Sequence, residues 1–375
     1  MNFELSITQR QVQETFKDFV DRRVMPNAQA IDENQVFPKE LFKEVGDLGF
    51  FGMRYSEEAG GTNMDIVSYT LAVIELSRGS LSLAAACTMQ SLMATYFLNR
   101  LGDEEVKTYF SAALKGEKIG GICMTEPNAG SDLFGIQSKA QVLEDGFILD
   151  GQKTWVTSAP VADFFTVLAK TDTAEGVSIF FVPAKLEGVK IGKSIEKLGV
   201  RGSVTSEVFF DNVKLPKNYL LGNLGDGTKY LSEILAEIRI MTSALSIGVA
   251  TAAFEDALQY AKDRKQFGQP IYKFQAVKMK FAEMAVQLET AKLYTLYAAS
   301  LSDNHKSRRK EAMIAKLYAS ECANSICDNA SRVLASYGYA NDYPLQRYLR
   351  DARFTLIGGG TSEILKINIA KEIEQ

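Results

Sequence analysis

Apolar residues near the N-terminus recur every three or four positions, at Val12, Phe16, Phe19 and Val20. Ser6 and Gln9 precede this repeat and form a capping-box signature, which marks the start of a helix. Residues 64–102 are rich in small and apolar side chains, a composition typical of helices buried on most sides. The pattern predicts a helical domain over residues 1–120.

The period of the apolar pattern changes to two in the middle of the chain. Runs rich in β-branched and aromatic residues alternate with Gly, Asp and Pro turns, at residues 147–159, 164–170, 178–184 and 206–216. This spacing predicts a small antiparallel β-domain or barrel over residues 121–225.

Long helical patterns return after the β-rich region, at residues 241–267 and 274–301. Helices this long and apolar bury one face within the chain and another against a partner subunit. Residues 226–375 are therefore predicted to form a helical domain that takes part in an oligomer.

Composition narrows the function classes. The chain has 375 residues, 46% of them hydrophobic, with a formal net charge of −4 and an isoelectric point near 5.4. No excess of Lys or Arg is available to neutralise phosphates, so we expect no nucleic-acid partner. The N-terminus lacks an apolar signal-peptide core, and no run approaches about 18 apolar residues. We expect a cytoplasmic protein with no membrane segment.

Cysteine and histidine usage argues against a metal site. The cysteines lack metal-ligand spacing and resemble buried thiols of a reducing compartment; they are Cys87, Cys123, Cys322 and Cys327. His305 is the only histidine, which nearly excludes a His base or a His-bound metal. The densest basic cluster is expected to be a solvated helix start, and it comprises Lys306, Arg308, Arg309 and Lys310.

Two stretches carry candidate chemistry. The turn-rich segment 120-GGICMTEPNAGSD-132 follows a predicted strand and exposes backbone N–H groups and hydroxyls, which suit an anion or the edge of a polar ring. In 151-GQKTWVTSA-159, Trp155 and Thr157 are two positions apart, so both lie on the same face of the predicted strand. They offer a flat aromatic wall beside a hydroxyl donor, a combination that a flavin ring requires.

The chain resembles the acyl-CoA dehydrogenase family. These two stretches, followed in order by 197-KLGVRGS-203, 264-RKQFGQP-270 and 361-TSEI-364, match motifs of that family over essentially the whole chain. The resemblance implies an α+β fold with a helical N-terminal domain, a central β-barrel and a C-terminal four-helix bundle. It also implies a homotetramer with one FAD per subunit.

The resemblance further implies which residues hold FAD and substrate. Around the flavin ring it places Ile122, Met124, Thr125, Gly130, Ser131, Trp155 and Thr157. Arg264 and Phe267 would reach the FAD of a neighbouring subunit, with Gln275 near the pyrophosphate. Arg332 and Ser336 stand where the family has a glutamine and a glycine that touch the dinucleotide, and Thr361 and Glu363 belong to the last motif. Ser131 and Arg239 would lie near the thioester or its pantetheine arm.

One expected group is absent, the carboxylate that removes the substrate α-proton. An ungapped count from 350-RDARF-354 places Gly359 on the usual glutamate position. Some relatives carry the glutamate on the first long helix of the last domain instead, at the position of Ile238. The neighbouring Glu237 would serve as a base if a π-bulge turned it inward, and otherwise it is a surface carboxylate. Glu233 is a weaker substitute.

The glycines around this position have two interpretations. Gly358 to Gly360 form a backbone hinge with unusual φ angles, or they widen the pocket for a branched or cyclic acyl group. We favour the second, because a small residue there accompanies the relocated base in some relatives.

Three hypotheses for the function follow. The first is FAD-dependent α,β-dehydrogenation of an acyl thioester, carried by CoA or by a phosphopantetheinyl carrier protein such as a prolyl-carrier protein. The second is a base-free flavoprotein of the desulfinase, reductase or oxygenase type, and the third is a non-catalytic protein that binds FAD and thioesters. The electron acceptor of the first would be an electron-transfer flavoprotein or oxygen.

Overall fold

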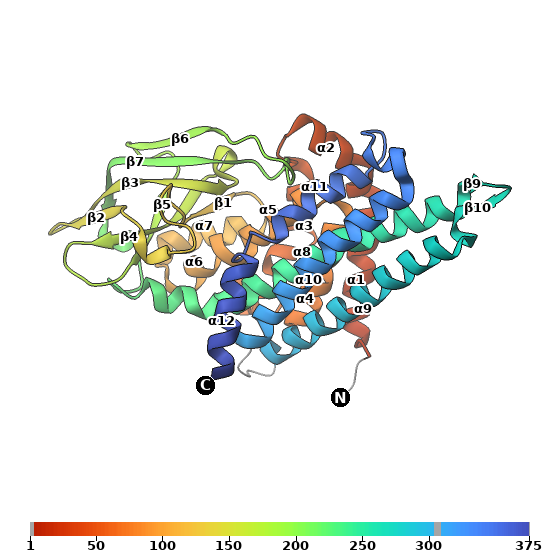
Figure 1. Cartoon of the computed structure of the whole chain (residues 1–375). Helices are drawn as coiled ribbons and strands as arrows, with labels where there is room; N and C mark the ends of the chain where they lie inside the picture. Colours follow the sequence, from red (N-terminus) through yellow and green to blue (C-terminus); the bar gives the residue numbers. More distant parts are fainter. Residues whose placement is uncertain (1–3, 304–308, 375) are drawn as a thin grey trace.

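The computed structural model describes residues 4–303 and 309–374. A β-domain, in the middle of the sequence, lies at one end of the molecule, and helices from both ends of the chain form the rest (Figure 1). The α+β fold class is confirmed. His305, Lys306 and Arg308, which include part of the expected helix start, lie outside the described residues. Arg309 and Lys310 belong to helix α10.

The N-terminal part is helical, as predicted. Its first helix begins with the expected capping box, in which the Gln9 N–H donates to Ser6 Oγ at 3.1 Å and the Ser6 N–H donates to Gln9 Oε1 at 2.9 Å. The α-helices are α1 (Ile7–Phe19), α2 (Ala28–Asn34), α3 (Lys39–Asp47), α4 (Ile66–Gly79), α5 (Leu81–Met89), α6 (Tyr96–Leu101) and α7 (Glu104–Leu114). Two π-helical segments, η1 (Val20–Val24) and η5 (Gln90–Ala94), interrupt the series.

The middle part is a twisted β-sheet. Its strands are β1 (Gly120–Cys123), β2 (Lys139–Val142), β3 (Gly146–Thr157), β4 (Phe164–Thr171), β5 (Ser178–Pro183), β6 (Val189–Ser194), β7 (Thr205–Pro216) and β8 (Leu220–Leu221). The order is β6-β7-β3-β2-β4-β5-β8, with β1 paired to β4. Most neighbours are antiparallel, as predicted, but β1 and β2 each run parallel to β4.

The last part is a helical bundle. Its elements are α8 (Gly227–Asp263), a hairpin of β9 (Lys265–Gln266) and β10 (Gln269–Pro270), α9 (Gln275–Asp303), α10 (Arg309–Leu334), the 3₁₀ segment η10 (Ala335–Tyr339), α11 (Leu345–Thr355) and α12 (Ser362–Glu374). Helix α8 packs against α10 and α9 and also against α4 of the N-terminal part. It therefore joins the two helical domains.

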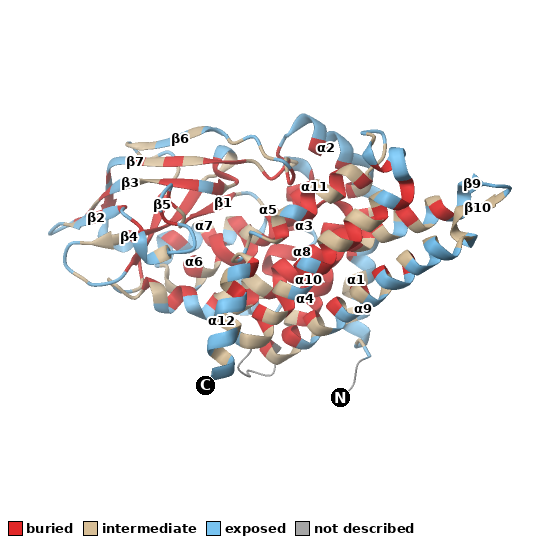
Figure 2. Cartoon of the chain, in the orientation of Figure 1, coloured by how far each residue is buried: buried red, intermediate tan, exposed pale blue. Residues whose placement is uncertain are grey.

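Burial is concentrated where these helices meet (Figure 2). The stretch Leu81–Leu101 and helix α8 are long and apolar enough to cross a membrane, but their apolar windows are 89% and 67% buried inside the protein. Such burial is typical of core helices, so they are weak evidence for a membrane segment.

Candidate active site

The loop after β1 is fixed to strand β3 beside Trp155. The Thr154 N–H donates to the carbonyl of Thr125 at 2.9 Å, and the fully buried Lys153 donates from Nζ to Glu126 Oε1 at 2.8 Å. Glu126 also accepts the backbone N–H groups of Gln137 and Ser138. A buried carboxylate with this many donors is well satisfied, so the pair holds the loop and the strand in one arrangement.

Trp155 lies at an irregular point of strand β3. The register to β7 shifts between Lys153 and Val156, and Trp155 has a φ angle of 58°, which L-residues rarely adopt. Its side chain is 58% exposed, an unusual position for a large aromatic ring. The irregularity leaves Trp155 on the surface instead of in the core.

The other predicted ring contacts lie on the same loop and strand. Ile122 is buried in β1, Met124, Thr125 and Thr157 are half-buried, and Gly130 and Ser131 are exposed. A Cβ on Gly121 would lie 3.2 Å from the carbonyl oxygen of Thr157, which shows how closely β1 approaches the end of β3. The sequence motifs are therefore brought together, as a flavin-ring site requires.

A second group of predicted cofactor residues lies at the opposite end of the molecule, around the β9–β10 hairpin (Figure 1). Arg264 is an exposed residue at the end of α8, and its guanidinium lies 5.8 Å from the centre of the Tyr337 ring. Phe267, at the hairpin tip, has a φ angle of 50° and is 93% exposed, and Gln275 is exposed at the start of α9. The hairpin and the β-domain, whose strand β3 contains Trp155, lie at opposite ends of the molecule.

The remaining predicted cofactor residues are also on the surface or near it. Arg332 is exposed and its Nε forms an ion pair with Asp328 Oδ2 at 2.7 Å, and Ser336 is exposed in η10. Thr361 is half-buried before α12, and Glu363 is exposed in its first turn. Arg332 can reach a phosphate only by sharing or leaving its contact with Asp328.

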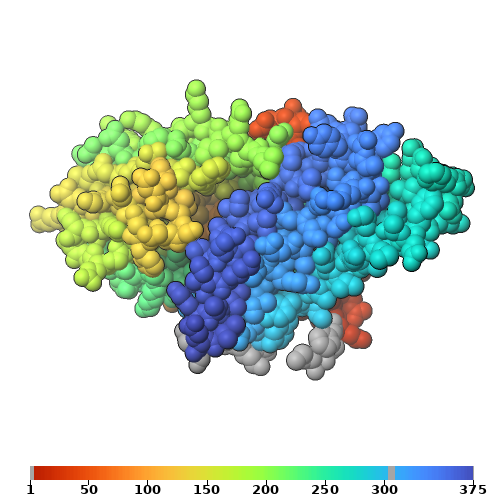
Figure 3. Space-filling view, in the orientation of Figure 1, coloured from red at the N-terminus to blue at the C-terminus, as the bar shows by residue number. Residues whose placement is uncertain are grey.

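Gly359 lies against helix α8 in a backbone conformation that favours glycine. Its φ angle is +71° and that of Gly360 is +105°, so the hinge-like interpretation of these glycines is supported. A Cβ on Gly359 would lie 2.8 Å from Thr242 Oγ1. A glutamate there would be strained and would displace the Thr242 hydroxyl. In the space-filling view the surface is hollowed between the β-domain and α12, the helix that follows these glycines (Figure 3).

Glu237 is not on the surface, and the expectation of a surface carboxylate is wrong. It is buried and accepts a hydrogen bond from Nη2 of Arg54. The Arg54 side chain is also buried, with only 6% of it exposed. Burial alone would lower the pKa of Arg54, but the Glu237 carboxylate raises it overall. Helix α8 is α-helical from Gly227 to Asp263, so the π-bulge that would turn Glu237 inward does not occur. Glu233, one turn earlier, accepts from the hydroxyl of Tyr96 at 2.9 Å.

Arg239 is half-buried, and its Nε has no hydrogen-bond partner among the described residues. Burial, with a smaller effect of Arg309, lowers its pKa. It precedes Thr242 by three positions, so both lie on one face of α8. An unpaired buried guanidinium nitrogen is costly, which agrees with the expected ligand contact.

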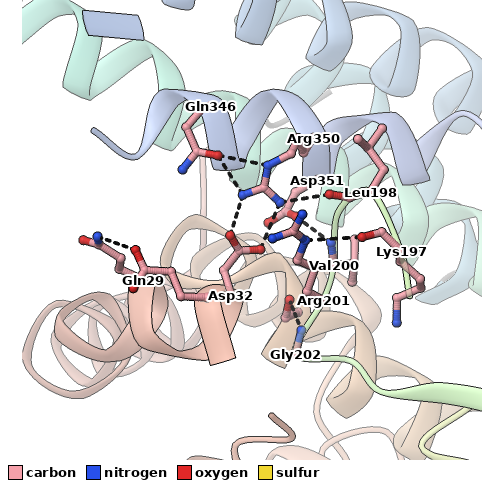
Figure 4. Close-up of polar contacts among 12 residues, drawn as sticks. Gln29, Asp32, Lys197, Leu198, Val200, Arg201, Gly202, Gln346, Arg350 and Asp351 are labelled. Carbon is pink, nitrogen blue, oxygen red and sulfur yellow. Dashed lines mark hydrogen bonds and ion pairs between the residues drawn. The ribbon is translucent and has the colours of Figure 1, made fainter. Parts of the chain in front are cut away.

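The KLGVRGS motif at residues 197–203 has a structural role (Figure 4). The Val200 N–H donates to Asp351 Oδ1 at 2.6 Å, and burial raises the pKa of Asp351 to about 6. Arg350 donates to a carbonyl of the same motif at 2.9 Å and pairs with Asp32 of α2. The motif thus ties the β-domain to both helical domains.

The comparison with known proteins identifies the class. Models of the N-terminal, middle and C-terminal domains of acyl-CoA dehydrogenases match residues 6–117, 121–213 and 225–374. This chain belongs to the acyl-CoA dehydrogenase family, oxidoreductases that act on CH–CH groups of CoA thioesters. Its cofactor is FAD, which solved relatives contain and which the exposed, irregular Trp155 fits.

Three relatives illustrate the range of the family. Benzylmalonyl-CoA dehydrogenase of Aromatoleum aromaticum is 52% identical over 375 residues, the full length of both chains. The structure of butyryl-CoA dehydrogenase from Megasphaera elsdenii superposes with a TM-score of 0.96 at 32% identity, covering 100% of both chains. That of the prolyl acyl carrier protein oxidase AnaB gives 0.94 at 30% identity, covering 99% and 100%.

Sequence reasoning missed Arg54, Thr242 and Lys316. Arg54 and Lys316 are single charges inside the apolar runs 50-FFGMRY-55 and 312-AMIAKLYA-319, and both are buried in the fold. A lone charge in such a run is a usable signal for a buried partner. Thr242 carries no such signal, because only the fold brings it to Gly359.

Proposed function

We propose that this protein catalyses a decarboxylating dehydrogenation of a malonyl-type CoA thioester with an arylmethyl substituent, of which benzylmalonyl-CoA is the simplest. The observation that carries the proposal is Gly359 at the position of the missing base. The relative that shares 52% of the sequence is named for such a thioester.

A carboxylate on the substrate Cα makes the base unnecessary. Loss of CO2 leaves the bonding electron pair on Cα, where removal of the α-proton would otherwise leave it. The hydride departs from Cβ, and a Cα=Cβ double bond forms. The products are CO2 and the aryl-conjugated α,β-unsaturated thioester. When bound, FAD accepts the hydride.

The surroundings of the glycines suit this step. The side chains nearest to a Cβ placed on Gly358, Gly359 and Gly360 are those of Phe354, Thr242 and Leu365, all uncharged. Loss of CO2 moves negative charge from the carboxylate towards the thioester oxygen, so cations paired with the carboxylate would oppose it. A glutamate at residue 359 would repel the same carboxylate.

Other residues have binding roles in the proposal. Trp155 and Thr157 hold the flavin ring together with the loop from Ile122 to Ser131, and the unpaired Nε of Arg239 serves the thioester or its pantetheine arm. Because Arg264 and Phe267 lie at the end of the molecule opposite the β-domain, they complete the FAD site of a second copy. The working form is therefore a homo-oligomer, as expected for a tetramer built from dimers.

The other hypotheses remain distinguishable. A CoA thioester is favoured over a carrier-protein thioester as the substrate. The prolyl acyl carrier protein oxidase AnaB is 30% identical to this chain, whereas benzylmalonyl-CoA dehydrogenase is 52% identical. A reductase would share the absent base but would oxidise reduced FAD with an unsaturated thioester. The electron acceptor, an electron-transferring flavoprotein or oxygen, is not specified by the site residues.

Anaerobic mixing of the FAD-loaded protein with benzylmalonyl-CoA tests the proposal. We expect the visible absorbance of the oxidised flavin to bleach within a single turnover. A flavin that stays oxidised with benzylmalonyl-CoA and with ring-substituted analogues would contradict the proposal.

A further inference from the structure

Lys316 is a fully buried cation beside the glycines. It lies on α10, and its Nζ donates to the carbonyl of Gly360 at 2.6 Å and to that of Leu356 at 3.3 Å. Burial of an ammonium group is costly unless its donors are satisfied. Here both acceptors are backbone carbonyls of the loop between Leu356 and Gly360, so the ammonium group binds that loop.

The two carbonyls bracket the segment that contains Gly359. Just beyond it, Ser362 donates from Oγ to Glu321 Oε1 at 2.7 Å, and Glu321 also lies on α10. Gly359 and Gly360 have positive φ angles. Because glycine has no Cβ, it adopts many backbone conformations, so this segment has little intrinsic preference for its observed shape. Contacts with α10 therefore determine how the loop lies against Thr242.

We propose that Lys316 is a positioning residue, which holds the loop of Gly358 to Gly360 at the substrate Cα through its two carbonyl contacts. This inference rests on the proposed function in one respect, that Gly359 lies beside Cα of the bound substrate. Lys316 does not touch the substrate. It acts by keeping the space for the Cα carboxylate open and its uncharged lining in place.

Charges on α10 itself and on two other helices, α8 and α12, act on this ammonium group. Burial lowers the pKa of Lys316 to about 8, Glu321 and Glu363 of α12 raise it, and Arg239 of α8 lowers it further. The ammonium form, with its stronger hydrogen bonds, is thus present below about pH 8 and is lost as the pH rises through that value. Flavin reduction should decline over the same interval.

The experiment compares FAD-loaded Lys316→Met and Lys316→Arg with Lys310→Met, a control on the same helix whose lysine is partly exposed. Lys316→Met keeps the length of the side chain without its charge. We expect flavin reduction by benzylmalonyl-CoA to slow by about tenfold or more, with the half-saturating concentration changed less than about threefold, because misplacement affects the reacting geometry. In Lys316→Arg, whose charge does not titrate, the decline near pH 8 should disappear.

Hydrogen–deuterium exchange provides a readout that needs no substrate. Amides of residues 356–361 should exchange faster in Lys316→Met than in the wild type at pH 7, with α8 unchanged. Wild-type exchange in this segment, or wild-type reduction rates in Lys316→Met, would overturn the proposal. An alkaline decline retained in a folded Lys316→Arg would do so as well. If no malonyl thioester reduces the flavin, the proposed function fails, while the exchange result still decides whether Lys316 orders the loop.

Discussion

3-Phenylpropanoyl-CoA, which has the aryl group and thioester of benzylmalonyl-CoA but no carboxylate on Cα, is expected to reduce the bound FAD at least about 1000-fold more slowly. This thioester must lose an α-proton, and a positioned general base typically contributes about 10²–10⁴-fold to such a step. Gly359 supplies no base, and Glu237 is held by Arg54.

The comparison is made by stopped-flow absorbance at saturating thioester. Competition with benzylmalonyl-CoA verifies that 3-phenylpropanoyl-CoA binds, so slow reduction cannot be ascribed to an empty site. Equal rates for the two thioesters would mean that an unrecognised base operates. If Glu237 is that base, Glu237→Gln should slow the reaction of 3-phenylpropanoyl-CoA by about 100-fold or more. This substitution keeps the size of the side chain.

Arg54→Met should destabilise the protein by about 3–5 kcal/mol, because it leaves the Glu237 carboxylate buried without its cation. The guanidinium also lies 5.2 and 5.4 Å from the ring centres of Tyr55 and Tyr96, so it fills a space lined by aromatic rings. Glu237→Gln/Arg54→Met should recover much of the loss, since a neutral pair has no unpaired charge. Thermal unfolding of the FAD-loaded variants measures both.

The matched control is the exposed pair of Arg22 and Asp18, for which Arg22→Met should change stability by less than about 1 kcal/mol. If Arg54→Met were as stable as the wild type, the buried pair would not explain the position of Glu237. If the double variant also reduced its flavin at the wild-type rate, Glu237 would have no catalytic role.

The fold was accessible from sequence because its signals are local. The capping box at Ser6, the period-two runs of the β-domain and the pairing of Trp155 with Thr157 depend on neighbours in the chain. The structure places Trp155 on the surface, while its role toward a ligand stays a prediction. Its φ angle of 58° and the strand irregularity around it were not foreseen.

The environment of the missing base could not be derived in the same way. Glu237 and Arg54 are separated by 183 positions, and their contact depends on how α8 packs against the N-terminal domain. Lys316 and Gly360 are 44 positions apart. A helical period tells which positions share a face, but only packing determines which face meets which partner. The number of subunits stays a prediction for the same reason.

The most direct test of the account is to count the CO2 released in a single turnover of benzylmalonyl-CoA labelled with ¹³C in its free carboxylate. We expect about one labelled CO2 per flavin reduced, together with an unsaturated thioester that has lost the label, because the departing carboxylate replaces the α-proton. Reduced flavin accompanied by a product that keeps the labelled carboxylate would show that an α-proton had been removed, and would contradict the account.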